Sequence, residues 1–88
     1  MKILIKKISK SDLSFTFLLR NHKSIRKNFF NSKIISLSDH KKWFLNKIKN
    51  KKDFFFLIKN KTNKIGIIRF DKNEFYFDVS ISILPKYQ

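Results

Sequence analysis

The stretch EFYFDVSISI, residues 74–83, determines the fold class of this chain. Every odd-numbered position in it, from Phe75 to Ile83, is apolar, and every even-numbered position carries a side chain that can form hydrogen bonds. Side chains alternate between the two faces of a strand, so this period of two predicts a β-strand with an apolar core face and a polar face.

Two more strands precede this one. Residues 54–58, FFFLI, form a short and wholly apolar run, which is typical of a strand that is covered on both faces. Residues 65–70 form the next strand, and polar turns at 60–64 and 71–73 separate the three. The second half of the chain is therefore predicted to be an antiparallel meander.

The first half of the chain predicts one strand and helices. β-Branched residues favour a strand over residues 2–8, and apolar spacing predicts a helix over 12–21 and a short helical turn over 25–30. Ser36 begins a serine-x-x-acid cap that predicts a helix over 37–49. The order β-α-α-β-β-β predicts an α/β (α+β) fold in which helices pack on the meander.

Length and composition limit the function classes. With 88 residues the chain forms one small domain, which excludes a two-domain enzyme. The absence of Cys excludes disulfides, thiolate zinc sites and a cysteine nucleophile, and two His without an acid cluster predict no metal site. The N-terminal apolar run is too short for a signal peptide and no run is long enough to span a membrane, so we expect a cytoplasmic protein without a membrane partner.

The net charge of +15, from 21 Lys and Arg against 6 Asp and Glu, suggests an anionic partner. The chain is also dominated by Lys, Asn, Ile and Phe, whose codons are A/T-rich, and genome composition is the simpler explanation of much of this charge. Nucleic-acid binding therefore stays open as an alternative function. A second alternative is an interaction module that a homo-oligomer or another chain completes.

Three strings carry a resemblance to a known family: LRNHKSIRK (residues 19–27), ISLSDHKKWF (35–44), and IGIIRF (65–70) followed by DVSISILPKYQ (78–88). In this order they resemble the N-terminal half of a GNAT-superfamily N-acetyltransferase. They are most similar to the branch that acetylates amino groups of nucleotide-linked sugars, including enzymes of the pseudaminic-acid pathway. The resemblance implies that residues 1–88 are a partial acetyltransferase domain that uses acetyl-CoA as acyl donor.

The resemblance also implies where acetyl-CoA would bind. Ile81, Ser82 and Ile83 match the segment whose main chain hydrogen-bonds the pantetheine arm, which docks like an extra strand. Gln88 matches the first residue of the glycine loop that binds the pyrophosphate. Because the loop glycines are not in this sequence and the last strand is left as an uncovered edge, we expect the 88-residue product to be an incomplete, inactive fragment that is marginally stable or insoluble alone.

For catalysis, the resemblance points to Asp78 as the base that takes a proton from the attacking amine. Tyr76, Ser80 and Ser82 share the polar face of the same strand and are candidates for orienting water or substrate. The alternative for Asp78 is a solvated strand residue that neutralises a nearby lysine, and the other three are then ordinary half-exposed strand residues.

For the acceptor, Arg20, Asn21 and Arg26 lie on the connection that borders the acceptor pocket in this superfamily. Arginine suits the diphosphate of a nucleotide sugar, whereas the alternative is that Asn21 ends the first helix and both arginines are exposed. His40 lies on one side of its helix with Trp43, and it is either a base or substrate contact or part of the packing around the tryptophan.

Overall fold

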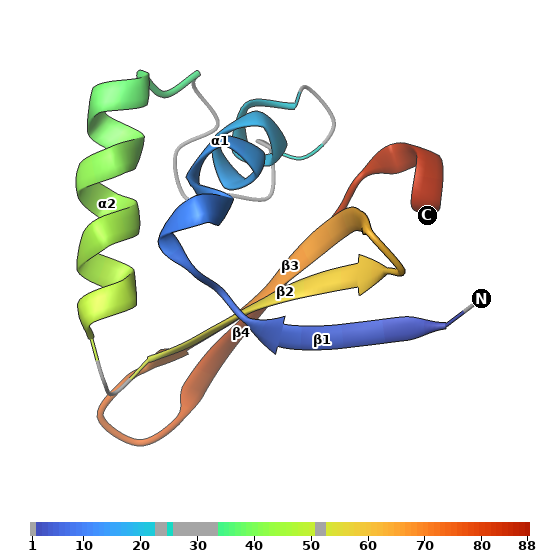
Figure 1. Cartoon of the computed structure of the whole chain (residues 1–88). Helices are drawn as coiled ribbons and strands as arrows, with labels where there is room; N and C mark the ends of the chain where they lie inside the picture. The colour runs from blue at the N-terminus through green and yellow to red at the C-terminus, as the bar shows by residue number, and fades with distance from the viewer. Residues whose placement is uncertain (1, 23–24, 26–33, 51–52) are drawn as a thin grey trace.

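The computed structural model describes residues 2–22, 25, 34–50 and 53–88. Two helices lie on one face of a four-stranded antiparallel sheet (Figure 1). The elements are β1 (Ile3–Lys7), α1 (Leu13–Asn21), α2 (Leu37–Lys49), β2 (Phe54–Asn60), β3 (Asn63–Lys72) and β4 (Phe77–Ile83). The predicted order β-α-α-β-β-β and the meander β1-β2-β3-β4 are confirmed. The short helical turn predicted over 25–30 falls almost wholly outside the described residues.

Local signals set the starts of both helices. The Ser36 hydroxyl accepts the amide of Asp39 at 3.2 Å, so the cap predicted for α2 is present. A 3-10 turn, Lys10–Asp12, leads into α1, and the Ser9 amide donates to the Asp12 carboxylate at 2.9 Å.

Asp12 also ties this turn to the sheet. Its side chain is 1% exposed and pairs with the Lys64 ammonium at 2.6 Å. Burial alone raises the pKa of Asp12, but the hydrogen bonds from Lys64 and Ser9 outweigh burial, and the pKa lies below its ordinary value. The carboxylate therefore stays ionised and holds the start of β3 against the entry to α1.

The core lies between the helices and the face of the sheet that they cover. Its buried residues come from the segment after β1, both helices, their connection and the central strands: Ile8, Leu19, Ile25, Phe44, Phe55, Leu57 and Ile67. Gathering these side chains between two layers removes most of the large apolar groups of α1 and α2 from water.

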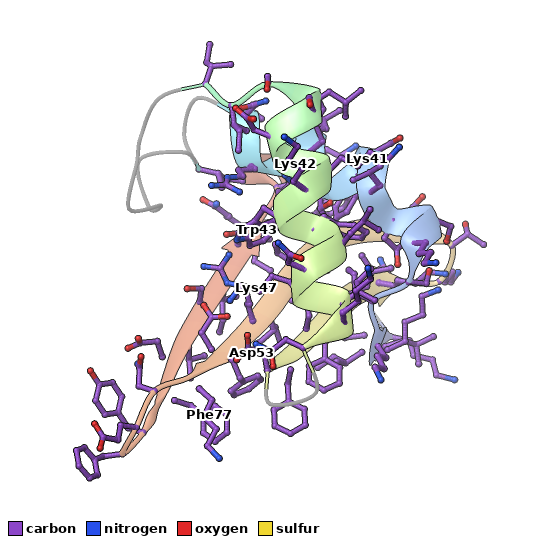
Figure 2. The ribbon with its side chains drawn as sticks, turned by 90° about the vertical axis from the view of Figure 1, so that its left-hand side faces the viewer. Lys41, Lys42, Trp43, Lys47, Asp53 and Phe77 are labelled. Carbon is purple, nitrogen blue, oxygen red and sulfur yellow. The ribbon has the colours of Figure 1, made fainter. Side chains whose placement is uncertain are left out.

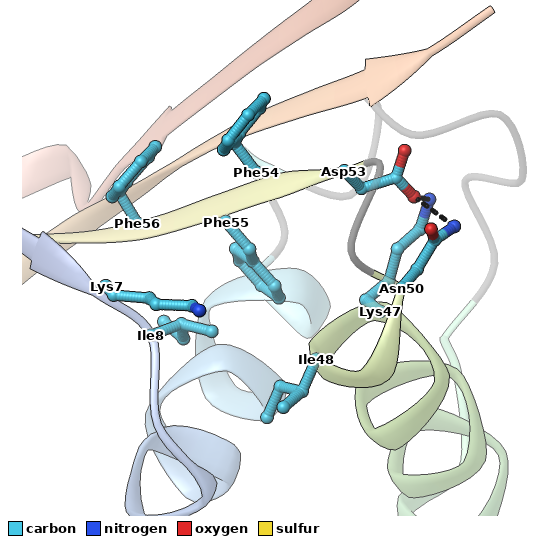
Figure 3. A pocket seen from close by; sticks show the side chains of 9 residues that line it. All are labelled: Lys7, Ile8, Lys47, Ile48, Asn50, Asp53, Phe54, Phe55 and Phe56. Carbon is cyan, nitrogen blue, oxygen red and sulfur yellow. Dashed lines mark hydrogen bonds and ion pairs between the residues drawn. The ribbon is translucent and has the colours of Figure 1, made fainter.

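The prediction that β2 is covered on both faces is wrong within the described part of the chain. Phe55 points toward the helices, whereas Phe54 and Phe56 point to the other side of the strand (Figure 3). Phe55 is 5% exposed and Phe54 is 49% exposed. The apolar run did not distinguish a doubly covered strand from a singly covered one, because both described helices lie on the same side.

The prediction for the last strand needs two corrections. β4 begins at Phe77 and not at residue 74, and its odd-numbered side chains from Phe77 to Ile81 are exposed, Val79 at 55% and Ile81 at 58%. The even-numbered Ser82 is the buried residue of this strand, because the helices cover the even-numbered face. The exposed apolar strand agrees with the expectation of an uncovered edge.

We call the uncovered side of the sheet the open face, defined by Phe54, Phe56, Phe70, Phe77, Val79 and Ile81. Its register pairs Phe54 with Phe70 and Phe70 with Val79. The rings of Phe54 and Phe56 stack with centroids 6.4 Å apart, and Phe77 lies at the end of the sheet remote from α1 (Figure 2). Neither of the two described helices is long and apolar enough to cross a bilayer.

Candidate site on strand β4 and the facing helices

The edge of β4 that points away from β3 offers backbone hydrogen-bonding groups. The Leu84 amide donates to the Ile65 carbonyl at 2.9 Å, and the Asn73 amide donates to the Tyr76 carbonyl at 2.7 Å. Both bonds involve even-numbered residues, Tyr76 and Leu84, and the register between β3 and β4 does not shift between them. Hydrogen-bonded and non-hydrogen-bonded pairs alternate along an antiparallel pair of strands, so the even-numbered residues of β4 direct their backbone groups toward β3. Ile81 and Ile83 therefore direct their N–H and C=O groups to the edge, whereas the backbone of Ser82 bonds within the sheet.

The C-terminal residues fold back on this edge. Pro85–Tyr87 form a 3-10 turn, and the Gln88 side-chain amide donates to the Ile83 carbonyl at 2.9 Å. That carbonyl lies at the edge, as the alternation requires. Three of the four residues predicted to contact the cofactor, Ile81, Ile83 and Gln88, thus meet at one place.

The helix-facing side of β4 carries Asp78, Ser80 and Ser82 in one row. Asp78 is exposed and accepts a hydrogen bond from the Asn73 side-chain amide. Asp78 and Ser82 are four positions apart, which is about 14 Å along a strand. Tyr76 does not share this row, because it lies in the turn before β4 and is 62% exposed.

Arg20, Trp43 and Arg69 come together from α1, α2 and β3. The guanidinium carbon of Arg20 lies 4.8 Å from the centroid of the Trp43 ring, and that of Arg69 lies 5.1 Å from it. Burial, and then the positive charge of Arg69, lower the pKa of Arg20. We call these three residues the arginine–tryptophan cluster. Arg26, the other arginine predicted to bind substrate, lies outside the described residues.

An ion-pair network continues from this cluster. Arg69 pairs with Asp71 at 3.0 Å, and Lys47 pairs with Asp71 at 2.9 Å and with Asp53 at 3.2 Å. Figure 2 shows Trp43, Lys47 and Asp53 along one side of α2. Burial raises the pKa of Asp53, but hydrogen bonds from the Lys72 amide and Lys47 outweigh it and lower the pKa.

Sequence reasoning missed Arg69 and Asp71. A signal was present: both continue the inward-facing alternation of β3 after the buried Ile65 and Ile67. Charged residues on the inward face of a strand need partners, and α2 supplies them here with Trp43 and Lys47.

His40 is fully buried among the described residues, which supports the alternative that it packs around the tryptophan. Its Nε2 lies 2.9 Å from the Thr16 hydroxyl, which donates to the Leu13 carbonyl at 2.9 Å. The hydroxyl proton is used for Leu13, so the hydroxyl accepts from Nε2–H. Burial, followed by the charge of Arg20, lowers the pKa of His40 to about 4. The imidazole is therefore neutral at pH 7 and joins α1 to α2.

Asn21 ends α1 and joins it to the segment before α2. Its side-chain amide donates to the Ile35 carbonyl at 3.0 Å and its carbonyl accepts the Ile35 amide at 2.9 Å. This paired contact occupies both ends of the side-chain amide. The structure thus supports the structural role of Asn21 over a contact with substrate.

Replacing Asn21 by alanine is expected to lower the free energy of unfolding by about 2 kcal/mol, because two part-buried backbone groups of Ile35 lose their partner. Asn21→Asp keeps the acceptor and is expected to lose about 1 kcal/mol. Urea unfolding measures both losses. Asn46→Ala, at an exposed position of α2, is the control and should stay within about 0.5 kcal/mol of the native chain. Equal stability of Asn21→Ala and the native chain would contradict this role.

A separate cavity of about 360 Å³ opens where β1, β2 and the end of α2 meet (Figure 3). It is lined by Lys7, Ile8, Lys47, Ile48, Asn50, Asp53, Phe54, Phe55 and Phe56. None of the predicted site residues lines it, and its Lys47 and Asp53 already pair with each other. We therefore place the candidate site at β4. Within the described ranges, no three or more His, Asp or Glu residues gather into a metal-binding group.

No protein-family model matches this sequence, and no curated protein does. Solved structures do match. The spermidine N-acetyltransferase of Vibrio cholerae, in complex with CoA and spermine, superposes with a TM-score of 0.81 at 20% identity, over 98% of this chain and 53% of that one. The fold is that of half of a GNAT N-acetyltransferase.

Two further solved structures match this chain with similar TM-scores. A chimera of the Vibrio cholerae enzyme SpeG and hSSAT gives a TM-score of 0.80 at 16% identity, over 100% of this chain and 54% of that one. A domain from Methanocaldococcus jannaschii DSM 2661 gives 0.75 at 20% identity, over 93% and 55%. The chain thus spans about half the length of the acetyltransferases and of the domain that it matches. The fold predicted from the sequence is confirmed.

Proposed function

We propose that this chain belongs to an acetyl-CoA-dependent N-acetyltransferase, of which residues 1–88 form part of the domain. The observation that carries the proposal is the edge of β4, where Ile81 and Ile83 direct backbone groups outward in a fold that other N-acetyltransferases share. An extended amide-containing chain such as pantetheine can add to that edge as a strand does. Gln88 lies beside the same edge and is the proposed start of the phosphate-binding segment.

Acetyl-CoA supplies a thioester as acyl donor. The neutral nitrogen of the acceptor attacks the thioester carbonyl carbon, the C–N bond forms, and the C–S bond breaks with release of the CoA thiolate. The ammonium proton must leave the nitrogen during this sequence. Asp78 is the proposed base. About 14 Å of strand separates it from Ser82, which is more than one water molecule can bridge, so we propose that the proton passes to Asp78 through a chain of waters. Ser80 lies between them and is proposed to orient this chain, with Tyr76 as an outer contact.

For the acceptor we propose the amino group of a nucleotide-linked sugar, in line with the sequence resemblance to the amino-sugar branch. Two of the matched structures are named for spermidine acetylation, which makes a polyamine the rival acceptor. Net charge argues against a polycation here, because a chain of +15 repels it. We place the protein in the cytoplasm, where nucleotide-linked sugars are made.

The backbone edge can be tested by removing one outward N–H. Ile81→Pro removes the amide that points away from β3 and leaves the ladder bonds of the even-numbered residues, as proline at a sheet edge permits. We expect binding of acetyl-CoA, measured by calorimetry, to weaken about tenfold because pantetheine loses a hydrogen bond and close contact with the edge.

The control for this test separates pantetheine from phosphate. Adenosine 3′,5′-bisphosphate has the charged groups of CoA without pantetheine, and its affinity should be equal for Ile81→Pro and the native chain. Ile81→Val keeps the backbone amide and should bind acetyl-CoA normally. If Ile81→Pro and the native chain bind acetyl-CoA with equal affinity, the backbone edge of β4 does not hold pantetheine, and the observation that carries the proposal is lost.

The open face favours a second candidate, an interaction module completed by another copy or another chain. Phe54, Phe77 and Val79 are each more than two-fifths exposed, which is unusual for neighbouring apolar side chains on one sheet. Light scattering tests this candidate, because a module completed by its own copies forms a defined oligomer. The acetyltransferase proposal requires in addition that the chain binds acetyl-CoA.

A further inference from the structure

Strand β1 lies at the edge of the sheet opposite to β4 and is exposed along its whole length. Within the described residues its only strand neighbour is β2 (Figure 1). All five residues of β1 are exposed, and Ile3, Leu4 and Ile5 are exposed by 47%, 46% and 58%. An edge of this kind presents a row of backbone groups to which another strand can add.

The register of β1 and β2 shows which of these backbone groups point outward. The Ile8 amide donates to the Phe55 carbonyl at 2.9 Å, and the pairing of the two strands does not shift along β1. Hydrogen-bonded and non-hydrogen-bonded pairs alternate, so the even-numbered residues of β1 direct their backbone groups toward β2. The N–H and C=O groups of Ile3, Ile5 and Lys7 therefore point away from the sheet.

The charge along this edge is positive. Lysines lie on β1, next to its two ends and on β2: Lys2, Lys6, Lys7, Lys10 and Lys59. None of the six acidic residues belongs to β1 or β2. Asp12 and Asp53, which lie nearest to these strands in the sequence, pair with Lys64 and Lys47. The edge of β1 therefore attracts a negatively charged partner.

The side chains of β1 indicate what kind of strand fits this edge. Ile3 and Ile5 point to one face of the sheet, and Lys2 and Lys6 alternate with them and point to the other. Across neighbouring strands, apolar pairs and opposite charges stabilise, whereas like charges destabilise. A strand with apolar residues on one side and carboxylates on the other satisfies both sets. A second copy of this chain does not, because it brings a net charge of +15 to a basic edge.

We propose that the edge of β1 binds an extended acidic segment of a partner protein, which adds antiparallel to Ile3–Lys7 as a further strand. Main-chain hydrogen bonds supply the affinity and the lysines select acidic segments. The edge of β4 is a poorer site for such a segment, because Asp78 lies on β4 and the Gln88 side chain already donates to the Ile83 carbonyl. The two edges are on opposite sides of the sheet, so this proposal does not depend on acetyl transfer.

The probe is a capped, fluorescently labelled peptide of about six alternating glutamate and valine residues, the usual length of a strand. Its anisotropy is measured during titration with the full chain at about 0.15 M salt, where long-range attraction is screened. In the proposed pairing the valines lie opposite Ile3 and Ile5, and their amides face β1. N-Methylation of the valines removes these amides and keeps every charge. We expect the native chain to bind the unmodified peptide at least about tenfold more tightly than the methylated one.

Variants of the chain locate the site. Ile5→Pro removes one outward amide and leaves the backbone bonds of its neighbours to β2, and it should raise Kd about tenfold. The matched control, Ile81→Pro, removes an outward amide at the opposite edge and should change Kd less than about twofold. Lys6→Gln should raise Kd about threefold. Lys41→Gln, on the exposed side of α2 (Figure 2), should change it less than about twofold, because salt screens a distant charge.

Three results would overturn the proposal. Equal affinity for the two peptides would show general attraction to a basic chain. A larger effect of Ile81→Pro than of Ile5→Pro would place the peptide on β4. A single-stranded oligonucleotide of equal charge that displaces the labelled peptide at a lower concentration than the unlabelled peptide does would assign the lysines to nucleic acid. If Ile5→Pro does not fold, the comparison of the two peptides on the native chain decides alone.

Discussion

Replacing Gly66 by alanine is expected to lower the free energy of unfolding by about 3 kcal/mol, the upper part of the range for overpacked sites. A Cβ at this position would lie 2.3 Å from the Ser82 carbonyl oxygen and 3.1 Å from the Ile83 Cα. Both are backbone atoms, which cannot turn aside as the end of a side chain can. β4 must therefore move away from β3, or its pairing with Gly66 must break.

The same substitution is expected to weaken acetyl-CoA binding, because Ile81 and Ile83 belong to the segment that must move. Urea unfolding followed by Trp43 fluorescence measures the stability, and calorimetry measures the binding. Ser80→Ala is the control on β4, since it keeps the Cβ and should cost less than about 1 kcal/mol. A urea midpoint for Gly66→Ala equal to that of the native chain would mean that the sheet accommodates the methyl group and that the close approach is unimportant.

Helices and strands that carry a cap or a clear apolar period could be predicted from the sequence. The packing of these elements against one another could not. The predicted helix over 37–49 coincides with α2, because the Ser36 cap and the helical spacing of Leu37 and Phe44 lie within that segment. The strand period of residues 74–83 was equally clear. Which of its faces is covered depends on where α1 and α2 pack, and that is a long-range property.

The candidate site shows the same division. Ile81, Ser82 and Ile83 were all predicted to contact the cofactor through their backbone. Only the register of β3 and β4 shows that Ile81 and Ile83 face the open edge, whereas the backbone groups of Ser82 point toward β3. Arg69 and Asp71 were missed although their alternation in β3 was visible, and the contact of Arg69 with Trp43 depends on the long-range placement of α2. The sequence left the role of His40 open, and its burial against Thr16 supports the packing alternative.

His40 should make the stability of the chain depend on pH, in the range between the pKa of His40 in the folded chain and its pKa in the unfolded chain. The pKa is about 4 in the folded chain and 6.5 without the fold, so the unfolded chain binds the proton more strongly. The contribution of His40 to stability is complete above pH 6.5 and is lost as the pH falls toward 4. The difference of two to three pKa units corresponds to about 3 kcal/mol.

The measurement is the urea midpoint between pH 8 and pH 4 for the native chain and His40→Gln. Glutamine keeps a donor for the Thr16 hydroxyl but does not titrate, so its stability curve should be nearly flat where the native curve falls. Asn46→Ala, at an exposed position of α2 without a titrating group, is the control and should keep the native slope. The lowered pKa values of Asp12 and Asp53 act below their ordinary value of 3.8, so acid loss of these carboxylates does not account for the change. Parallel curves for the native chain and His40→Gln would mean that His40 takes up its proton within the folded chain, which the closed packing of Phe17, Trp43 and Phe44 around the ring opposes.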